Sequence, residues 1–372
     1  MPRSTTPSRS SSTPLPGCGA ELVGGDGPVL VAMSGGVDSS VAAALLLDAG
    51  VDVIGVTLRL WGGTSDSGCC SVADVDDARR VAQQLGIDHY VFAMSEAFES
   101  HVVAPYVADH LAGRTPNPCI ECNRHLKFGA LLDQSVRLGA SAVATGHHAQ
   151  VDTGSDGRLR LRRGADPDKD QSYVVSVMGQ DELARVRFPV GAITKHEVRR
   201  LADQRGLRTA SKPESQDVCF IRSDEGRHRF MSARADLHAG RVIDGAGHEV
   251  GRTEAVELVT IGQRKGLHLA GGGARRYVTR VDIASRTVTV GSAADTLGSA
   301  QPVEAWTWTD GAVPDGTEVD VQTSAHSRPC RAVVAERATR LEWIEPRTAV
   351  APGQAVVIYD GDVVLGGAVA AA

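Results

Sequence analysis

The chain has 372 residues, 42% hydrophobic and 23% charged, which is typical of a globular protein with two or three domains. It contains no run of roughly 18 apolar residues, as a membrane span needs, and no apolar segment of a secretory signal, so a cytoplasmic location without membrane contact is expected. The net charge of −6 argues against a general nucleic-acid coat but allows a local basic surface.

The first half of the chain alternates strand and helix patterns after a tail at 1–27, which is rich in Ser, Thr, Pro and Gly and is predicted to be disordered. Strands are predicted at 29–33, 51–58, 87–92 and 142–145, and helices at 41–47, 71–85 and 128–138. This alternation predicts an α/β fold with a doubly wound parallel sheet, which binds ligands at the carboxyl ends of its strands.

The last third of the chain has short β-branched runs separated by turn signals, which predict a C-terminal antiparallel β-barrel or small sheet. The runs lie at 277–283, 287–290, 318–323, 331–334, 356–359 and 363–365. The stretch before them is mixed and basic, and it predicts a separate small domain. The predicted division is therefore a tail at 1–27, a first domain at 28–214, a central domain at 215–283 and a barrel at 284–372.

A glycine- and serine-rich loop, Ser34-Gly35-Gly36-Val37-Asp38-Ser39-Ser40, lies between the first predicted strand and the first predicted helix. Its glycines let backbone amides approach an anion, and the helix adds the positive end of its dipole. The loop lacks the Gly-Lys-Ser/Thr of a Walker loop and the Gly-x-Gly-x-x-Gly of a dinucleotide loop. The loop therefore predicts a phosphate site that differs from both the Walker type and the dinucleotide-binding type.

The same loop resembles that of the ATP-pyrophosphatase (PP-loop) superfamily, which cuts ATP between its α and β phosphates and adenylates a substrate oxygen. The resemblance implies ATP as cofactor and Mg²⁺ held by Asp38. The nucleotide contacts that it implies are Ala32, Met33, Ser34, Gly35, Gly36, Val37, Asp38, Ser39, Leu58 and Gly146. His147 and His148 follow Gly146, and histidines beside a strand end are more often structural than catalytic.

Four further motifs narrow the resemblance to the tRNA-specific 2-thiouridylases. They are Gly113–Asn123 followed by Lys127-Phe128, Lys169–Tyr173, Ser215–Phe220 and Ile261–Leu267. This family adenylates the C2 carbonyl of the wobble uridine in tRNAs for Glu, Gln and Lys, and replaces the oxygen with sulfur. Adenylation is needed because a uracil carbonyl is a poor electrophile, and a cysteine persulfide supplies the soft nucleophile.

The family pattern also implies a role for individual residues. Cys219 carries the persulfide and Cys122 attacks it, with Asp38 as the third catalytic residue. Asn117, Pro118 and Cys119 lie against the target base, and Lys169, Asp170 and Gln171 contact the tRNA. The sulfur comes from a cysteine desulfurase or a sulfur-relay protein.

Cys119 departs from the family pattern, because the best-known members carry aspartate there. Cys119, Cys122 and Cys219 together could bind three irons of a [4Fe–4S] cluster and leave the fourth iron to hold sulfide. Cys119-x-x-Cys122 could equally be a redox pair or half of a zinc site. The cluster route and the persulfide route therefore both remain open, and they give the same product.

Basic residues flank both sulfur segments and predict phosphate contacts with tRNA. They are Arg158, Arg160, Arg162, Arg163, Arg199, Arg200, Arg205, Arg208, Lys212, Arg227, Arg229 and Arg234. Two rival functions remain. A C–N ligase or tRNA-lysidine-type enzyme would use the ATP loop without cysteine, and a silent RNA-binding protein would bind tRNA without releasing pyrophosphate.

Overall fold

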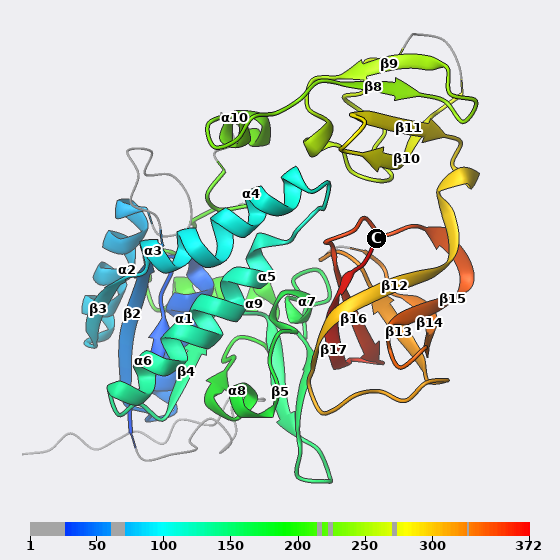
Figure 1. Ribbon diagram of the computed structural model, residues 1–372. Helices are drawn as coiled ribbons and strands as arrows, with labels where there is room; N and C mark the ends of the chain where they lie inside the picture. Colours follow the sequence, from blue (N-terminus) through cyan, green and yellow to red (C-terminus); the bar gives the residue numbers. More distant parts are fainter. Residues whose placement is uncertain (1–26, 61–70, 214–217, 222–225, 270–273, 326) are drawn as a thin grey trace, which may run out of the picture.

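The computed structural model describes residues 27–60, 71–213, 218–221, 226–269, 274–325 and 327–372, which form three units (Figure 1). The predicted disordered tail lies outside these residues, apart from Gly27. The first unit contains a parallel sheet in the order β3-β2-β1-β4-β7. Its strands are β1 (Val29–Ala32), β2 (Val53–Arg59), β3 (Asp88–Ala93), β4 (Ala142–Thr145) and β7 (Val186–Arg187). The strand order reverses between β1 and β4, where such sheets bind ligands.

Helices cover both faces of this sheet, because successive strand residues point to opposite sides. Val29 and Val31 enter one core with α1, α2 and α9, whereas Leu30 enters a second core with the helices from α3 to α6. The helices are α1 (Val37–Asp48), α2 (Val72–Leu85), α3 (Ser95–Phe98), η2 (Glu99–Val103), α4 (Ala104–Leu111), α5 (Pro118–Cys122), η3 (Asn123–Ala130), α6 (Leu131–Arg137), α7 (Ser172–Val175), α8 (Gln180–Arg185) and α9 (Lys195–Gln204). The predicted doubly wound fold is confirmed.

One helix begins earlier than predicted. The helix expected at 128–138 is the end of a continuous helical run through α5, η3 and α6 that starts at Pro118. Asn117 caps the run, since its side-chain oxygen accepts hydrogen bonds from the amides of Cys119 (3.1 Å) and Ile120 (3.4 Å). Asn followed by Pro is a strong helix-start signal, and it places the Cys119-x-x-Cys122 motif in a helix.

The central unit is a four-stranded sheet in the order β10-β11-β8-β9. It contains α10 (Gly226–Ser232), η4 (Val256–Leu258), β8 (Gly240–Ile243), β9 (Glu249–Thr253), β10 (Tyr277–Asp282) and β11 (Thr287–Gly291). The predicted boundary at 283/284 falls inside the hairpin of β10 and β11, so this sheet extends past it to Gly291.

The third unit is a closed six-stranded antiparallel barrel in the order β12-β15-β14-β13-β16-β17, which the pairing of β12 with β17 completes. It is preceded by η5 (Ala294–Thr296), and its strands are β12 (Leu297–Trp308), β13 (Glu318–Gln322), β14 (Cys330–Ala335), β15 (Arg340–Thr348), β16 (Ala355–Asp360) and β17 (Val363–Ala370). The predicted barrel is confirmed.

A hairpin of the first unit extends the barrel sheet. Its strands are β5 (Ala149–Thr153) and β6 (Leu159–Arg163), and β6 pairs with β17. Backbone hydrogen bonds thus join the first unit to the barrel. In the described part of the chain, no helix has the length and apolar character that crossing a bilayer requires.

Candidate active site

The predicted phosphate loop joins β1 to α1 and is closed by its own serines. The amide of Ser34 donates to the Ser39 hydroxyl (3.2 Å), and the Ser40 hydroxyl donates to the Gly36 carbonyl (2.8 Å). Gly36 is the N-cap of α1, and no side chain caps the first amides of that helix. Uncapped amides at a helix N-terminus suit a phosphate group.

Two glycines allow the loop to pack tightly. Gly35 has φ +69°, and a Cβ there would lie 2.3 Å from the Asp74 carbonyl oxygen. Gly146 follows β4, and a Cβ on it would lie 2.5 Å from the Ser39 amide nitrogen. The structure therefore places Gly146 directly against the phosphate loop, in agreement with the site that the sequence predicts.

Replacing Gly146 with alanine is expected to weaken ATP binding about tenfold, because the atoms that the new methyl group meets are backbone atoms that cannot rotate away. Titration with a fluorescent ATP analogue measures the effect. Gly245→Ala is the matched control, since a Cβ there meets nothing within 4 Å. Unchanged affinity in Gly146→Ala would show that this contact does not shape the nucleotide site.

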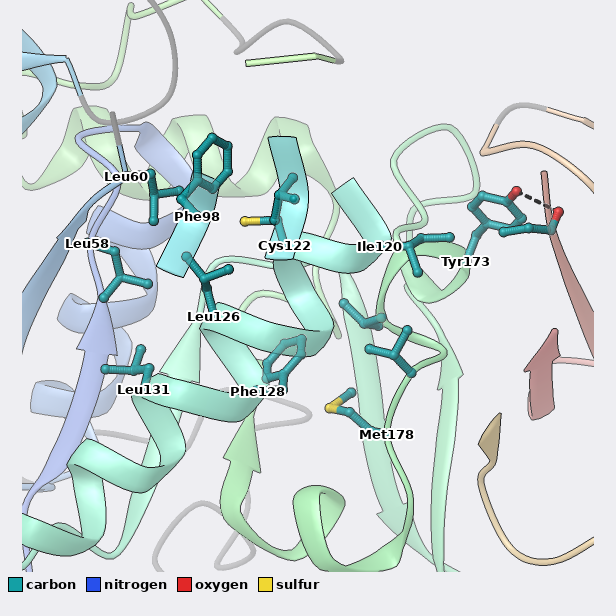
Figure 2. Packing of buried hydrophobic residues seen from close by; sticks show 14 of the residues in the cluster. Leu58, Leu60, Phe98, Ile120, Cys122, Leu126, Phe128, Leu131, Tyr173 and Met178 are labelled. Carbon is teal, nitrogen blue, oxygen red and sulfur yellow. Dashed lines mark hydrogen bonds between the residues drawn. The ribbon is translucent and has the colours of Figure 1, made fainter. Parts of the chain in front are cut away.

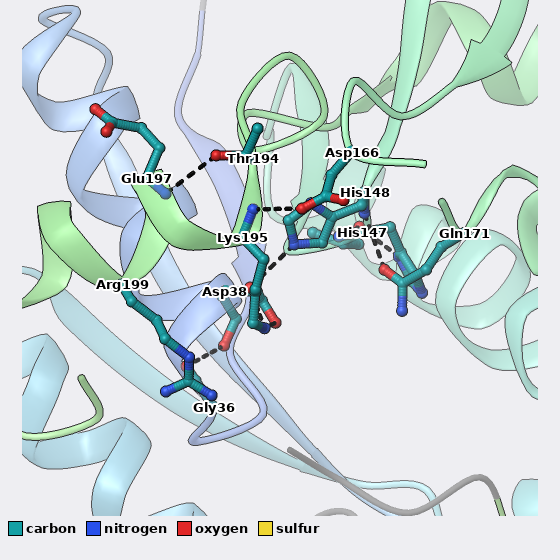
Figure 3. Close-up of polar contacts among 12 residues, drawn as sticks. Gly36, Asp38, His147, His148, Asp166, Gln171, Thr194, Lys195, Glu197 and Arg199 are labelled. Carbon is teal, nitrogen blue, oxygen red and sulfur yellow. Dashed lines mark hydrogen bonds and ion pairs between the residues drawn. The ribbon is translucent and has the colours of Figure 1, made fainter. Parts of the chain in front are cut away.

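Asp38, in the first turn of α1, contacts two side chains from distant parts of the chain, one lysine and one histidine (Figure 3). The Lys195 ammonium lies 2.7 and 2.6 Å from its two oxygens, and His148 Nε2 lies 3.1 Å from Oδ1. Burial opposes ionisation of Asp38, but the His148 hydrogen bond and the charge of Lys195 lower its pKa below the usual value. The loop thus carries an ionised carboxylate with its own counter-charge.

Sequence reasoning missed Lys195. It is the first residue of α9 after the N-cap Thr194, and only 11% of its side chain is exposed. A cation at a helix N-terminus is disfavoured by the helix dipole, so a lysine there needs another source of stabilisation. A lysine at this position could therefore have indicated an acidic partner elsewhere in the chain. The structure shows that this partner is Asp38.

His147 has a structural environment. It is buried beside the rings of Phe128 and Phe188, and its Nδ1 lies 2.7 Å from the Thr145 hydroxyl. Burial and then the charge of Lys127 hold the pKa of His147 well below its usual value. A neutral, enclosed imidazole fits a packing role, as the sequence favoured.

The remaining predicted nucleotide contacts lie at the carboxyl ends of β1 and β2. Met33 and Leu58 are buried and Ala32 is half-buried. The Met33 amide donates to the Val56 carbonyl (2.8 Å), which ties the two strand ends together. Their contact with a nucleotide stays a prediction.

The two cysteines predicted to take part in sulfur transfer, Cys122 and Cys219, lie in or against one apolar cluster. Cys122 is buried with Leu58, Leu60 and Phe98, and Figure 2 shows its sulfur on the side facing Leu60 and Phe98. Cys219 is half-buried and packs against the same cluster, as does Ala32. Both thiols therefore pack in or against the cluster that covers the Leu30 face of the parallel sheet.

Phe220 anchors the segment that carries Cys219. Its ring centroid lies 5.6 Å from that of Phe98, 5.4 Å from that of Tyr106 and 5.2 Å from that of Phe230. The first two contacts are edge-to-face and the third is tilted, and edge-to-face contacts are favourable for aromatic rings. They hold Cys219 beside α3 and α4.

The predicted three-thiolate metal set is not assembled. Among the described residues, which include Cys119, Cys122 and Cys219, no three His, Cys, Asp or Glu side chains form a group that could hold a metal ion. A [4Fe–4S] site is therefore not shown among the described residues, and the cluster route stays a prediction. Cys18, Cys69, Cys70 and residues 215–217 lie outside the described residues.

Several predicted tRNA contacts already have partners within the protein. The Asn117 oxygen caps α5, Pro118 is buried and Cys119 is half-buried. Asp170 forms an ion pair with Arg163, and Gln171 is hydrogen-bonded to His148. The structure thus places Asp170 and Gln171 in internal networks.

The basic run on β6 is neutralised by carboxylates, contrary to the prediction of a phosphate-binding surface there. Arg158 and Arg160 pair with Asp310, Arg162 pairs with Asp152 and Asp362, and Arg163 pairs with Asp170. The second run is also paired: Arg200 with Glu197, Arg205 with Asp48, Arg208 with Asp77, and Lys212 with Asp74 and Asp77. Most of the charge of both runs is therefore offset within the fold, whereas Arg199 donates to the backbone carbonyls of Ala210 and Lys212.

Comparisons with known proteins match nearly the whole chain. Residues 27–223 match a family model described as "tRNA methyl transferase HUP domain", 228–292 one described as "tRNA methyl transferase PRC-barrel domain", and 301–370 one described as "Aminomethyltransferase beta-barrel domain". The chain is 46% identical to the tRNA-specific 2-thiouridylase MnmA of Chloroflexus aurantiacus, over 91% of this chain and 97% of that protein. It is also 46% identical to the protein of the same name from Mycobacteroides abscessus, over 92% and 98% of the two chains.

Proposed function

Because the chain belongs to the family of tRNA-specific 2-thiouridylases, we propose that it uses ATP to adenylate the C2 carbonyl oxygen of the wobble uridine in tRNA and replaces that oxygen with sulfur. The observation that supports this proposal is that residues far apart in sequence meet in one apolar cluster. Cys122 and Leu58 belong to that cluster, and Cys219 and Ala32 pack against it, with Ala32 and Leu58 near the carboxyl ends of β1 and β2.

The phosphate loop serves the adenylation step. The uncapped amides of α1 bind the pyrophosphate part of ATP, and Lys195 offsets its negative charge. Asp38 fits Mg²⁺ because it is an ionised oxygen donor beside the phosphate site, and Mg²⁺ needs only one or two carboxylates when phosphate oxygens complete its shell. A bound Mg²⁺ would neutralise further phosphate charge.

The thiols serve the sulfur step by the persulfide route. The outer sulfur of a Cys219 persulfide attacks C2 and displaces AMP. The Cys122 thiolate then attacks the inner sulfur, which releases 2-thiouridine and leaves a Cys122–Cys219 disulfide that an external thiol reduces. No step of this route needs a cluster.

The partners follow the family. We assign tRNAs for Glu, Gln and Lys as substrates and a cysteine desulfurase or sulfur-relay protein as donor. The central sheet and the barrel are the surfaces left for the body of the tRNA, since the loop and the thiols lie in the first unit (Figure 1).

Purified protein incubated with ATP, unmodified tRNA and a persulfide donor is expected to form AMP, pyrophosphate and 2-thiouridine, which mass spectrometry of digested tRNA detects. Anaerobically purified protein is expected to be active without iron. Pyrophosphate release with a lysine adduct in place of sulfur would support the C–N ligase, and tRNA binding without pyrophosphate release would support the silent RNA-binding protein. Activity that tracks iron content would support the cluster route.

A further inference from the structure

A single loop contacts both partners of Asp38, His148 and Lys195. This loop, residues 164–171, connects β6 to α7. The Asp166 carboxylate accepts a hydrogen bond from the backbone amide of Lys195 (2.8 Å). Gln171 clamps the backbone of His148 on both sides: its amide donates to the His148 carbonyl (2.8 Å), and its side-chain oxygen accepts from the His148 amide (2.9 Å). Figure 3 shows Asp166, Gln171, His148 and Lys195 gathered around Asp38.

The clamp on His148 matters because no hydrogen bond from the described residues fixes the far side of its ring. Nε2 faces the Asp38 carboxylate, whereas the buried Nδ1 has no hydrogen-bond partner among the described residues. A histidine ring is normally oriented by the hydrogen bond at its second nitrogen. Here the direction of the ring depends on the backbone of His148, and therefore on Gln171.

The same loop is tied to the barrel through Asp170, whose side chain is only 7% exposed. One carboxylate oxygen accepts from Arg163 (2.7 Å) and from the Ser172 hydroxyl (2.9 Å). Arg163 also donates to Gln322 on β13 (2.8 Å), and its guanidinium carbon lies 3.7 Å from the ring centroid of the buried Tyr359 on β16. These contacts fix the loop against two barrel strands.

We infer that Gln171 and Asp166 are positioning residues of the ATP site, and that the barrel, through Asp170, sets the geometry of the Asp38–His148–Lys195 cluster. In this view Gln171 acts by positioning His148 and not by contacting tRNA. The inference rests on the proposed function only in taking ATP as the ligand of the phosphate loop. It makes the barrel part of the activating site as well as a surface for RNA.

The experiment compares ATP binding in the absence of tRNA with tRNA binding in the absence of ATP, using a fluorescent ATP analogue and unmodified tRNA. Gln171→Met keeps the size of the side chain but removes the acceptor, so the His148 amide is left unsatisfied. ATP affinity is expected to fall roughly tenfold and tRNA affinity to stay within about twofold. Gln171→Glu keeps the accepting oxygen and should recover most of the ATP affinity.

Asp168→Asn is the matched control, since Asp168 lies on the same loop and is exposed. Asp166→Ala tests the Lys195 side of the cluster independently and should also weaken ATP binding, which keeps the inference testable if Gln171→Met does not fold. Reduced tRNA affinity with unchanged ATP affinity in the folded variants would overturn it. A wild-type protein that binds no ATP would instead refute the proposed function.

Discussion

Replacing Lys195 with methionine is expected to slow tRNA-dependent pyrophosphate release by roughly 100- to 1,000-fold, the range seen when one donor to a developing charge is removed. The reason is electrostatic. The ammonium of Lys195 is nearly buried beside the phosphate loop, and the described structure gives Asp38 no other ion pair with a lysine or arginine. The rate of pyrophosphate release at saturating tRNA is the measurement. Arg200→Met on the same helix is the control, because Arg200 is exposed and pairs only with Glu197 among the described residues.

The double variant Asp38→Asn/Lys195→Met separates catalysis from stability. Lys195→Met alone leaves a carboxylate without its main partner, which costs about 1–3 kcal/mol, and the neutral pair should regain most of this stability but no activity. Folding lowers the pKa of Asp38, so its contribution to stability is present above the unfolded-state pKa and is lost as the pH falls through the folded value. Activity in the double variant equal to that of wild type would show that the pair is only structural.

The sequence predicted the sheet and the phosphate loop because both depend on local signals. The apolar runs of β1, β2 and β4 are continuous, and the loop between β1 and α1 consists of adjacent residues. Long barrel strands were harder. β12 contains Pro302, register shifts between Gly298 and Ala300, and a positive φ at Ala305, all of which break the alternation that marks a strand.

The charged residues of the site could not be placed from the sequence, because their partners are distant in the chain. Lys195 resembles any lysine on a polar helix until it is set beside Asp38. Arg158 and Arg160 form a basic run in the sequence, yet both pair with Asp310, about 150 residues away. A run of like charges in the sequence does not show which opposite charges folding brings beside it. The surface charge of the protein can therefore be assigned only once the fold is known.

Replacing Cys219 with serine is expected to reduce 2-thiouridine formation roughly 1,000-fold or more, because a hydroxyl cannot carry the transferable sulfur. Pyrophosphate release should stay within a few-fold of wild type, since adenylation uses no thiol. Cys122→Ser should lose thiolation equally, but the protein should retain one extra sulfur atom on Cys219, which intact-protein mass spectrometry after treatment with the donor reveals.

Cys330→Ser provides the matched control for these two variants. Cys330 is buried in the barrel, and its thiol donates to the Val321 carbonyl (3.3 Å), a hydrogen bond that a serine hydroxyl can also make. Thiolation by Cys330→Ser should therefore match wild type. Continued thiolation by Cys219→Ser would refute the persulfide assignment. Loss of both thiolation and pyrophosphate release would mean that Cys219 also shapes the adenylation site. Such an effect would act through the cluster that contains Leu58, against which Cys219 and Ala32 pack. Comparing the rate of thiolation with the rate of pyrophosphate release in these variants thus decides whether the thiols act only after ATP has been cleaved.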